Sequence, residues 1–305
     1  MMTFAAPELT AQVFARLPER FRLAGRPSDW TVGKDRSDLH SFLEGPAVDR
    51  DGNLYVVDIP FGRIFRIGPD GSFELFVEYD GEPNGLAIHR DGTLYVADHR
   101  RGLLTIDPRT REVRTRLARV RREGFKGLND LTFAANGDLY FTDQGQTALH
   151  DPTGRVYRLS ATDELTCLID NVPSPNGLAL APGDRLLYLA ATRANQIWRI
   201  PLHADGSIFK VNLFLQLQGG LTGPDGLAVD EQGNLVVCHC GLGTVWVFSR
   251  TGETLYRIRS QTGIDTSNAA FGGPDNRTLY VTESESGSIL AVPLPVPGRT
   301  LFSHA

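Results

Sequence analysis

The chain has 305 residues, of which 41% are hydrophobic, so it is long enough to bury a large core. Its formal net charge of −5 argues against a nucleic-acid partner, and no apolar run is long enough to cross a membrane. The start of the chain lacks a secretory signal pattern, and three cysteines (Cys167, Cys238 and Cys240) cannot form an even disulfide framework, so we expect a cytoplasmic protein.

The predicted elements begin with a short strand around residues 11–15, followed by a long connection over residues 17–43. Six copies of one pattern then fill the rest of the chain: a polar residue, a small residue, an apolar-small-apolar triplet, a tight turn and a second strand. The copies start 40 to 49 residues apart, at Glu44, Asn84, Asn129, Asn176, Asp225 and Ser267.

Each copy has the pattern of a β-hairpin, because alternating β-forming residues flank a turn such as Asp51-Gly52 or Asp91-Gly92. Hairpins that repeat with this period are typical of a β-propeller with one blade per repeat. The small middle residue of each triplet lies between large ones, which suits blades that pack face to face around a narrow axis. We therefore expect an all-β, six-bladed β-propeller.

Closure of the ring is also predicted. The last repeat ends with a strand-like segment, residues 288–294, and leaves too few residues for a full outer strand. The N-terminal strand can complete this last blade, which removes an exposed sheet edge. We expect a single domain over residues 1–305, in which residues 17–43 enter the first blade and are a candidate lid over one mouth of the channel.

The six opening residues of the copies should meet at that mouth, and they supply two carboxylates, three carboxamides and one hydroxyl. Such oxygen donors suit a hard divalent cation. For Asn84, Asn176 or Asp225 alone, a turn role is the better explanation, and the metal site is indicated by the six residues together. Glu44 has no such role, and its charge near the axis is costly unless a cation compensates it.

Four longer signatures occur in order: FLEGPAVDRDGNLYVVD, LNDLTFAANGDLYFTD, SPNGLAL and GPDGLAVDEQGNL. Together they resemble the superfamily of gluconolactonase, regucalcin (senescence marker protein) and luciferin-regenerating enzyme. The resemblance implies six blades and one divalent metal ion, held by Glu44, Asn176 and Asp225, with Asn129 as a further ligand or substrate contact. Ca²⁺ is the favoured ion, and Zn²⁺, Mg²⁺, Mn²⁺ and Fe²⁺ are alternatives. Regucalcin-like members place an arginine where this chain has Gly127, so that sugar contact does not carry over.

The implied reaction is the opening of a small lactone, whose carbonyl a bound metal ion would polarise. Two residues, Asp225 and Asp130, are candidates for the general base. Asp130 stands out because the equivalent position is glycine in four other copies and Asn268 in the last. Its structural alternative is to orient the Asn129 amide or to cap a turn.

Candidate substrate contacts are Asn129, Asp143, His239, His150 and Trp30. Each of the last four has a structural alternative. Asp143 can bond to loop backbone, His239 lies between two cysteines that are more simply small hydrophobes than zinc ligands, His150 can be a surface histidine, and Trp30 can anchor its loop to the ring.

The function expected from these observations is a metal-dependent hydrolase of a small lactone, with a sugar aldonolactone as the first choice. Alternatives are a phosphotriesterase-like hydrolase of the same fold, a non-enzymatic calcium-binding propeller, and a metal-free interaction module. Because propellers host both catalysis and binding, the fold alone does not decide among them. The expected partner is a small-molecule lactone, and the sequence leaves the oligomeric state open.

Overall fold

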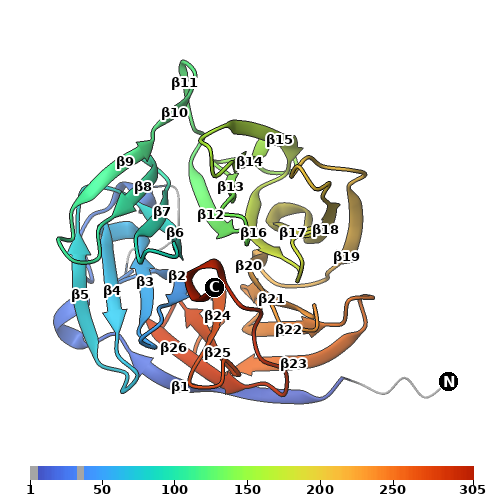
Figure 1. Ribbon diagram of the computed structural model, residues 1–305. Helices are drawn as coiled ribbons and strands as arrows, with labels where there is room; N and C mark the ends of the chain where they lie inside the picture. Colours follow the sequence, from blue (N-terminus) through green and yellow to red (C-terminus); the bar gives the residue numbers. More distant parts are fainter. Residues whose placement is uncertain (1–5, 33–37) are drawn as a thin grey trace.

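The computed structural model describes residues 6–32 and 38–305 as an all-β, propeller-like ring of sheets around a central axis (Figure 1). The helices of these residues are all short 3-10 turns, and none is long and apolar enough to cross a membrane. They are η1 (Glu19–Phe21), η2 (Asp29–Thr31), η3 (Ile59–Phe61), η4 (Thr192–Ala194) and η5 (Phe302–His304).

Four sheets are four-stranded, antiparallel, and follow the chain order. The first two sheets contain β2 (Leu43–Val48), β3 (Leu54–Asp58), β4 (Arg63–Ile67) and β5 (Phe73–Glu78), then β6 (Pro83–Ile88), β7 (Leu94–Asp98), β8 (Gly102–Ile106) and β9 (Val113–Leu117). The next two contain β12 (Leu128–Phe133), β13 (Leu139–Asp143), β14 (Gly154–Leu159) and β15 (Leu165–Val172), then β16 (Pro175–Leu180), β17 (Leu186–Ala191), β18 (Gln196–Pro201) and β19 (Asn212–Gln216).

A fifth sheet has eight strands and contains both the first and the last strand of the chain. In spatial order they are β20 (Gly223–Val229), β21 (Leu235–Cys240), β22 (Thr244–Phe248), β23 (Thr254–Ser260), β1 (Glu8–Arg16), β26 (Ser288–Pro293), β25 (Thr278–Glu283) and β24 (Thr266–Gly272). Strand β1 pairs antiparallel with β26, as at Val13 and Leu290, and parallel with β23, as at Leu9 and Ile258. A small hairpin, β10 (Arg119–Val120) and β11 (Glu123–Gly124), stands out from the ring (Figure 1).

Six strands line the axis, and each contacts the next in the cyclic order β2, β6, β12, β16, β20, β24 and back to β2. Each is followed by a tight turn and its antiparallel partner, as the repeat predicts. In the turn after β2, Gly52 adopts φ of 81°, a conformation that favours glycine, and its N–H donates to the carbonyl of Asp49. The chain therefore enters every inner strand from one face of the ring and leaves it toward the other.

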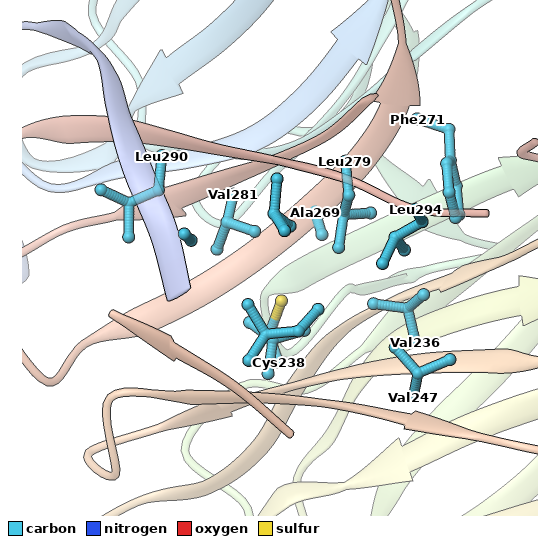
Figure 2. Packing of buried hydrophobic residues seen from close by; sticks show 13 residues of the cluster. Val236, Cys238, Val247, Ala269, Phe271, Leu279, Val281, Leu290 and Leu294 are labelled. Carbon is cyan, nitrogen blue, oxygen red and sulfur yellow. The ribbon is translucent and has the colours of Figure 1, made fainter. Parts of the chain in front are cut away.

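The hydrophobic core lies between neighbouring sheets, not within one central layer. The same holds for the two halves of the eight-stranded sheet: Figure 2 shows Cys238 and Val247 of β21 and β22 facing Val281 and Leu290 of β25 and β26. The thiol of Cys238 is buried in this cluster, so the residue behaves as a small hydrophobe.

Four of the strands that follow an inner strand end in a fully buried acid. Each carboxylate accepts a hydrogen bond from the backbone N–H of the residue just before the inner strand of the same hairpin. The pairs are Asp58 with Phe42 (2.7 Å), Asp98 with Glu82 (2.9 Å), Asp143 with Gly127 (2.8 Å) and Glu283 with Asp265 (3.2 Å). These acids therefore fix where each inner strand begins.

Candidate metal centre

The four predicted ligands lie at one level of the ring, near the start of four inner strands. Glu44 is the second residue of β2, Asn129 of β12 and Asn176 of β16, and Asp225 is the third residue of β20. All four are at least 92% buried, since their exposed fractions are 4%, 4%, 8% and 8%. The sequence spacing therefore brings four oxygen-bearing side chains to the same mouth of the channel.

Three carboxyl groups from three different sheets act on one another here. Burial raises the pKa of Glu44 well above its usual range, and the charges of Asp225 and Asp130 raise it further. Burial, followed by the charge of Asp130, raises the pKa of Asp225 to about 8. Burial also raises the pKa of Asp130 to about 7. Such a group of acids is unfavourable by itself and favours a positive ligand.

The two carboxamides are held by neighbouring groups. The side chain of Asn176 lies near the Asp225 carboxylate and offsets part of the rise that burial causes in its pKa. The Nδ2 of Asn129 donates to Oε1 of Gln144 at 3.0 Å, and Nε2 of Gln144 donates in turn to Oγ of Ser174 at 3.0 Å. Gln144 thus orients Asn129 so that its Oδ1 is the atom left for a ligand. Gln144 and Ser174 lie outside the repeated positions, so the sequence pattern gave no signal for them.

The donor set fits a hard divalent cation better than a soft one. Within residues 6–32 and 38–305, no group of three or more His, Cys, Asp and Glu side chains is arranged to hold a metal ion. Carboxamide oxygens would therefore have to complete the coordination that Glu44 and Asp225 begin, which is the chemistry that Ca²⁺ and similar ions accept. The repulsion between the two buried carboxylates is the feature that a dication would relieve.

Asp130 lies beside this ligand set. Its Oδ1 accepts a hydrogen bond from the N–H of Leu131 at 2.8 Å, and its own N–H donates to Oγ1 of Thr142 at 3.0 Å. Its carboxylate therefore keeps an oxygen for other partners. The hydrogen bond from the Leu131 N–H agrees with a structural role for Asp130, and the remaining carboxylate oxygen agrees with a role as general base.

Two predicted substrate contacts, Asp143 and His239, form hydrogen bonds within the protein. Asp143 is buried, its Oδ1 accepts from Gly127, and Oδ2 lies 4.0 Å from the Arg155 guanidinium. His239 is also buried: its Nε2 donates to the carbonyl of Gly219 at 3.1 Å, and its Nδ1 accepts from the Trp246 indole at 3.3 Å. A role in holding loops explains both side chains, and substrate contact stays a prediction.

The two remaining candidates lie in connections. His150 is exposed, between the bridged residues Ala148 and Asp151. The indole of Trp30 packs on the ring of Phe42 with centroids 4.8 Å apart, which is the anchoring alternative. Within the candidate lid, residues 33–37 lie outside the described residues, so the lid stays a prediction.

The last repeat and its neighbour hold two residues that the sequence interpretation missed. The hydroxyl of Ser267 bonds to the Leu43 carbonyl at 3.1 Å, whereas the next residue, Asn268, donates to Oε2 of Glu44 at 2.9 Å. The thiol of Cys240 donates to Oδ1 of Asp265 at 3.6 Å, and it lies near enough to Asp225 to offset part of the rise in the pKa of that acid. The only signal for Asn268 was its departure from glycine at that position.

The structure is a propeller-like ring in which buried carboxylates and carboxamides meet at one mouth of the channel. The family comparison then identifies the chain, because residues 42–285 match the model of the SMP-30/Gluconolactonase/LRE-like region, and the chain belongs to this family. It is 31% identical over 276 residues to the gluconolactonase of Zymomonas mobilis, covering 80% of this chain and 76% of that protein. It is 30% identical over 229 residues to lactonase drp35 of Staphylococcus aureus, covering 71% of this chain and 69% of that protein.

Solved structures support the fold. The chain superposes on regucalcin of Agrobacterium tumefaciens, described as a calcium-binding protein, with a TM-score of 0.77 and 20% identity over 99% of this chain and all of that one. It superposes on a gluconolactonase of Xanthomonas campestris with a TM-score of 0.74 and 23% identity, covering 96% of this chain and 99% of the other.

Proposed function

We propose that this chain is a metal-dependent hydrolase that opens a small lactone, with sugar aldonolactones as the first substrate class. The observation that carries the proposal is the meeting of Glu44, Asp225 and Asp130, with Asn129 and Asn176, at one channel mouth of a chain in this family. The gluconolactonase and lactonase relatives support the choice of a lactone.

Within this proposal, Glu44, Asn176 and Asp225 hold the dication, and Asn129 is a further ligand or a substrate contact. Ca²⁺ is the ion we favour, because all the donors are oxygens. A bound dication would act as a Lewis acid toward the lactone carbonyl. The protein's own part is to keep the donors fixed: Oε1 of Gln144 accepts from Nδ2 of Asn129 at 3.0 Å, and two N–H groups hold Oε2 of Glu44.

The proton of the attacking water needs an acceptor on the chain. Asp130 is the candidate outside the ligand set, and Asp225 is the candidate inside it. A substitution distinguishes the two candidates, because Asp130→Asn leaves Glu44, Asn176 and Asp225 unchanged. Loss of turnover in a variant that still binds metal would assign the general base to Asp130.

The finer architecture is also a proposal. We count the eight-stranded sheet as two blades, β20 to β23 and β24 to β26 with β1, which gives six blades in a single domain over residues 1–305. The support is the closed contact cycle of six inner strands and the antiparallel pairing of β1 with β26.

Residues 17–43 lead into β2 on the side of the carboxylates, so we propose them as a lid. The three cysteines are free, which agrees with a cytoplasmic location.

Proton release from a panel of lactones tests the function. The purified chain is assayed with aldonolactones and with lactones that lack hydroxyl groups, before and after a chelator, and again after Ca²⁺, Mg²⁺, Mn²⁺ or Zn²⁺ is restored. We expect turnover that the chelator abolishes and one ion restores. Unchanged turnover after complete metal removal would refute the mechanism, and hydrolysis of aryl phosphotriesters alone would select the competing class.

A further inference from the structure

Two inner strands carry a side chain where the others have glycine: Asp130 on β12 and Asn268 on β24. The glycines beside them leave the necessary room. A Cβ placed on Gly226 would run into the carboxamide of Asn268, and one placed on Gly85 would lie 2.9 Å from Oδ1 of Asp130. Gly226 has no positive φ, so the space that it leaves, and not its backbone conformation, explains this glycine.

The carboxamide of Asn268 lies between two of the three acids. Its Nδ2 donates to Oε2 of Glu44 at 2.9 Å, and the side chain is close enough to Asp130 to offset part of the rise that burial causes in the pKa of that acid. Its Oδ1 accepts from the N–H of Ala269 at 2.8 Å. Because that backbone donor needs the carbonyl oxygen, the amide orientation is fixed, and the NH₂ group is the end that faces Glu44. Asn268 is buried, with 5% of its surface exposed.

The contacts of Glu44 show what this arrangement does. Its Oε2 accepts both the Asn268 amide and the N–H of Gly45. Both bonds fall on one oxygen, so Oε1 is the oxygen that remains for a ligand. A buried glutamate has several rotamers, and these two donors select the one that the site needs.

We propose that Asn268 is a positioning residue of the metal centre, which fixes the orientation of the Glu44 carboxylate by donating an N–H to its Oε2. It neither binds the ion nor touches the substrate, and it acts through Glu44. The inference rests on the proposed function, because it concerns the dication site. With this role, the last inner strand, β24, contributes to the metal centre although it supplies none of the predicted ligands.

Calorimetric titration of the metal-free chain with Ca²⁺ tests the role directly, without any substrate. We expect Asn268→Ala to weaken Ca²⁺ binding by about tenfold or more, the usual effect of losing a group that orients a metal ligand. Asn234→Ala is the matched control, since Asn234 is a buried carboxamide that donates to Asp230 at 2.7 Å in the turn after β20, away from the site. Its Ca²⁺ affinity should equal that of the wild type.

Gly226→Ala gives a second test that keeps the carboxamide but displaces it. We expect weaker Ca²⁺ binding in this variant, because a Cβ on Gly226 would lie 2.1 Å from Cγ and Oδ1 of the Asn268 carboxamide. Ca²⁺ binding by Asn268→Ala and Gly226→Ala as tight as that of the wild type would overturn the role of Asn268 alone. Absence of dication binding by the wild type would overturn both this role and the proposed metal centre.

Discussion

At the scale of single residues, the buried acids at the mouth of the channel lower the stability of the fold, and a bound cation would offset this cost. Glu44 and Asp225 are buried, and each raises the cost of ionising its neighbours. In a protein without a ligand at this place, apolar residues of similar size would be more stable. Under the proposed function, a bound cation would compensate the charge of Glu44.

Glu44→Gln should remove the effect of metal on stability. Ca²⁺ at about 100 times its Kd should stabilise the wild type by about 2.7 kcal/mol relative to the chelated protein, and the variant should lose most of this gain. Melting temperatures with Ca²⁺ and with chelator give the measurement. Asp230→Asn changes a buried acid in a distant turn and should keep the full Ca²⁺ effect. Equal Ca²⁺ effects in Glu44→Gln and the wild type would remove Glu44 from the ligand set.

His40 should contribute to the pH dependence of stability. Its Nε2 lies 2.8 Å from Nη1 of Arg22, which stays charged, so this nitrogen must accept and the imidazole is neutral. Burial, followed by the charge of Arg22, lowers the pKa of His40 below its ordinary value of 6.5. As the pH falls below about 6.5, the unfolded chain binds a proton that the folded chain refuses, so stability falls.

The His40→Gln variant should therefore lose less stability than the wild type on acidification. Urea unfolding at several values between about pH 7 and pH 5 measures the difference in slope. His150→Gln is the control, since His150 is exposed. A wild-type slope that His40→Gln leaves unchanged would contradict the neutral, acceptor state of His40.

The sequence predicted the residues of the site better than their partners. Glu44, Asn129, Asn176 and Asp225 sit at repeated positions, so the repeat alone placed them at one level of the ring. Gln144 follows a return strand in a loop of its own, and nothing in the repeat marks it. Tertiary packing decides which loop residues contact the site, and a periodic sequence pattern gives no information about that packing.

At the scale of elements, the acids that end four return strands hold the hairpins in register. Their carboxylates accept backbone N–H groups ahead of the inner strands, and Asp143, predicted as a substrate contact, is one of them. The first of them, Asp58, is also paired with Arg63: the guanidinium Nε donates to Oδ2 at 2.8 Å, and both side chains are buried. The pattern gave the position of these acids but not the direction of their side chains.

Asp58→Ala should destabilise the fold by about 3–5 kcal/mol, because it leaves the Arg63 charge buried without its partner. Urea unfolding gives the free energy. The double variant Asp58→Ala with Arg63→Met should recover part of the loss, since no charge is then left unpaired. If the double variant is no more stable than Asp58→Ala alone, the loss comes from the missing bond to the Phe42 N–H and not from the charge.

At the scale of the whole molecule, both ends of the chain help to close the ring. The predicted N-terminal strand is present as β1 beside β26, but its parallel pairing with β23 was not predicted, because no repeat encodes it. The C-terminal tail was not predicted at all. It lies near the axis (Figure 1) and bonds to the turn after β2, where Arg50 donates to the carbonyl of Ser303 at 2.6 Å. A cavity of about 890 Å³ separates this tail from the level of Asp130 and Asn268.

Phe302 should anchor the tail without affecting the site. Its ring stacks on Phe133 with centroids 5.2 Å apart, meets His89 at 5.0 Å, and lies under the Arg90 guanidinium at 4.2 Å. With 5% of its surface exposed, its truncation in Phe302→Ala should cost about 3–5 kcal/mol.

Because the tail closes the mouth opposite to Glu44, Ca²⁺ affinity and the KM for a lactone should stay at wild-type values in Phe302→Ala. Phe209→Ala removes a ring that is 56% exposed and should leave the melting temperature nearly unchanged. A Phe302→Ala chain that melts like the wild type would show that the tail does not help to close the ring. One that melts lower and also binds Ca²⁺ more weakly would show that the two mouths of the channel are coupled through the inner strands.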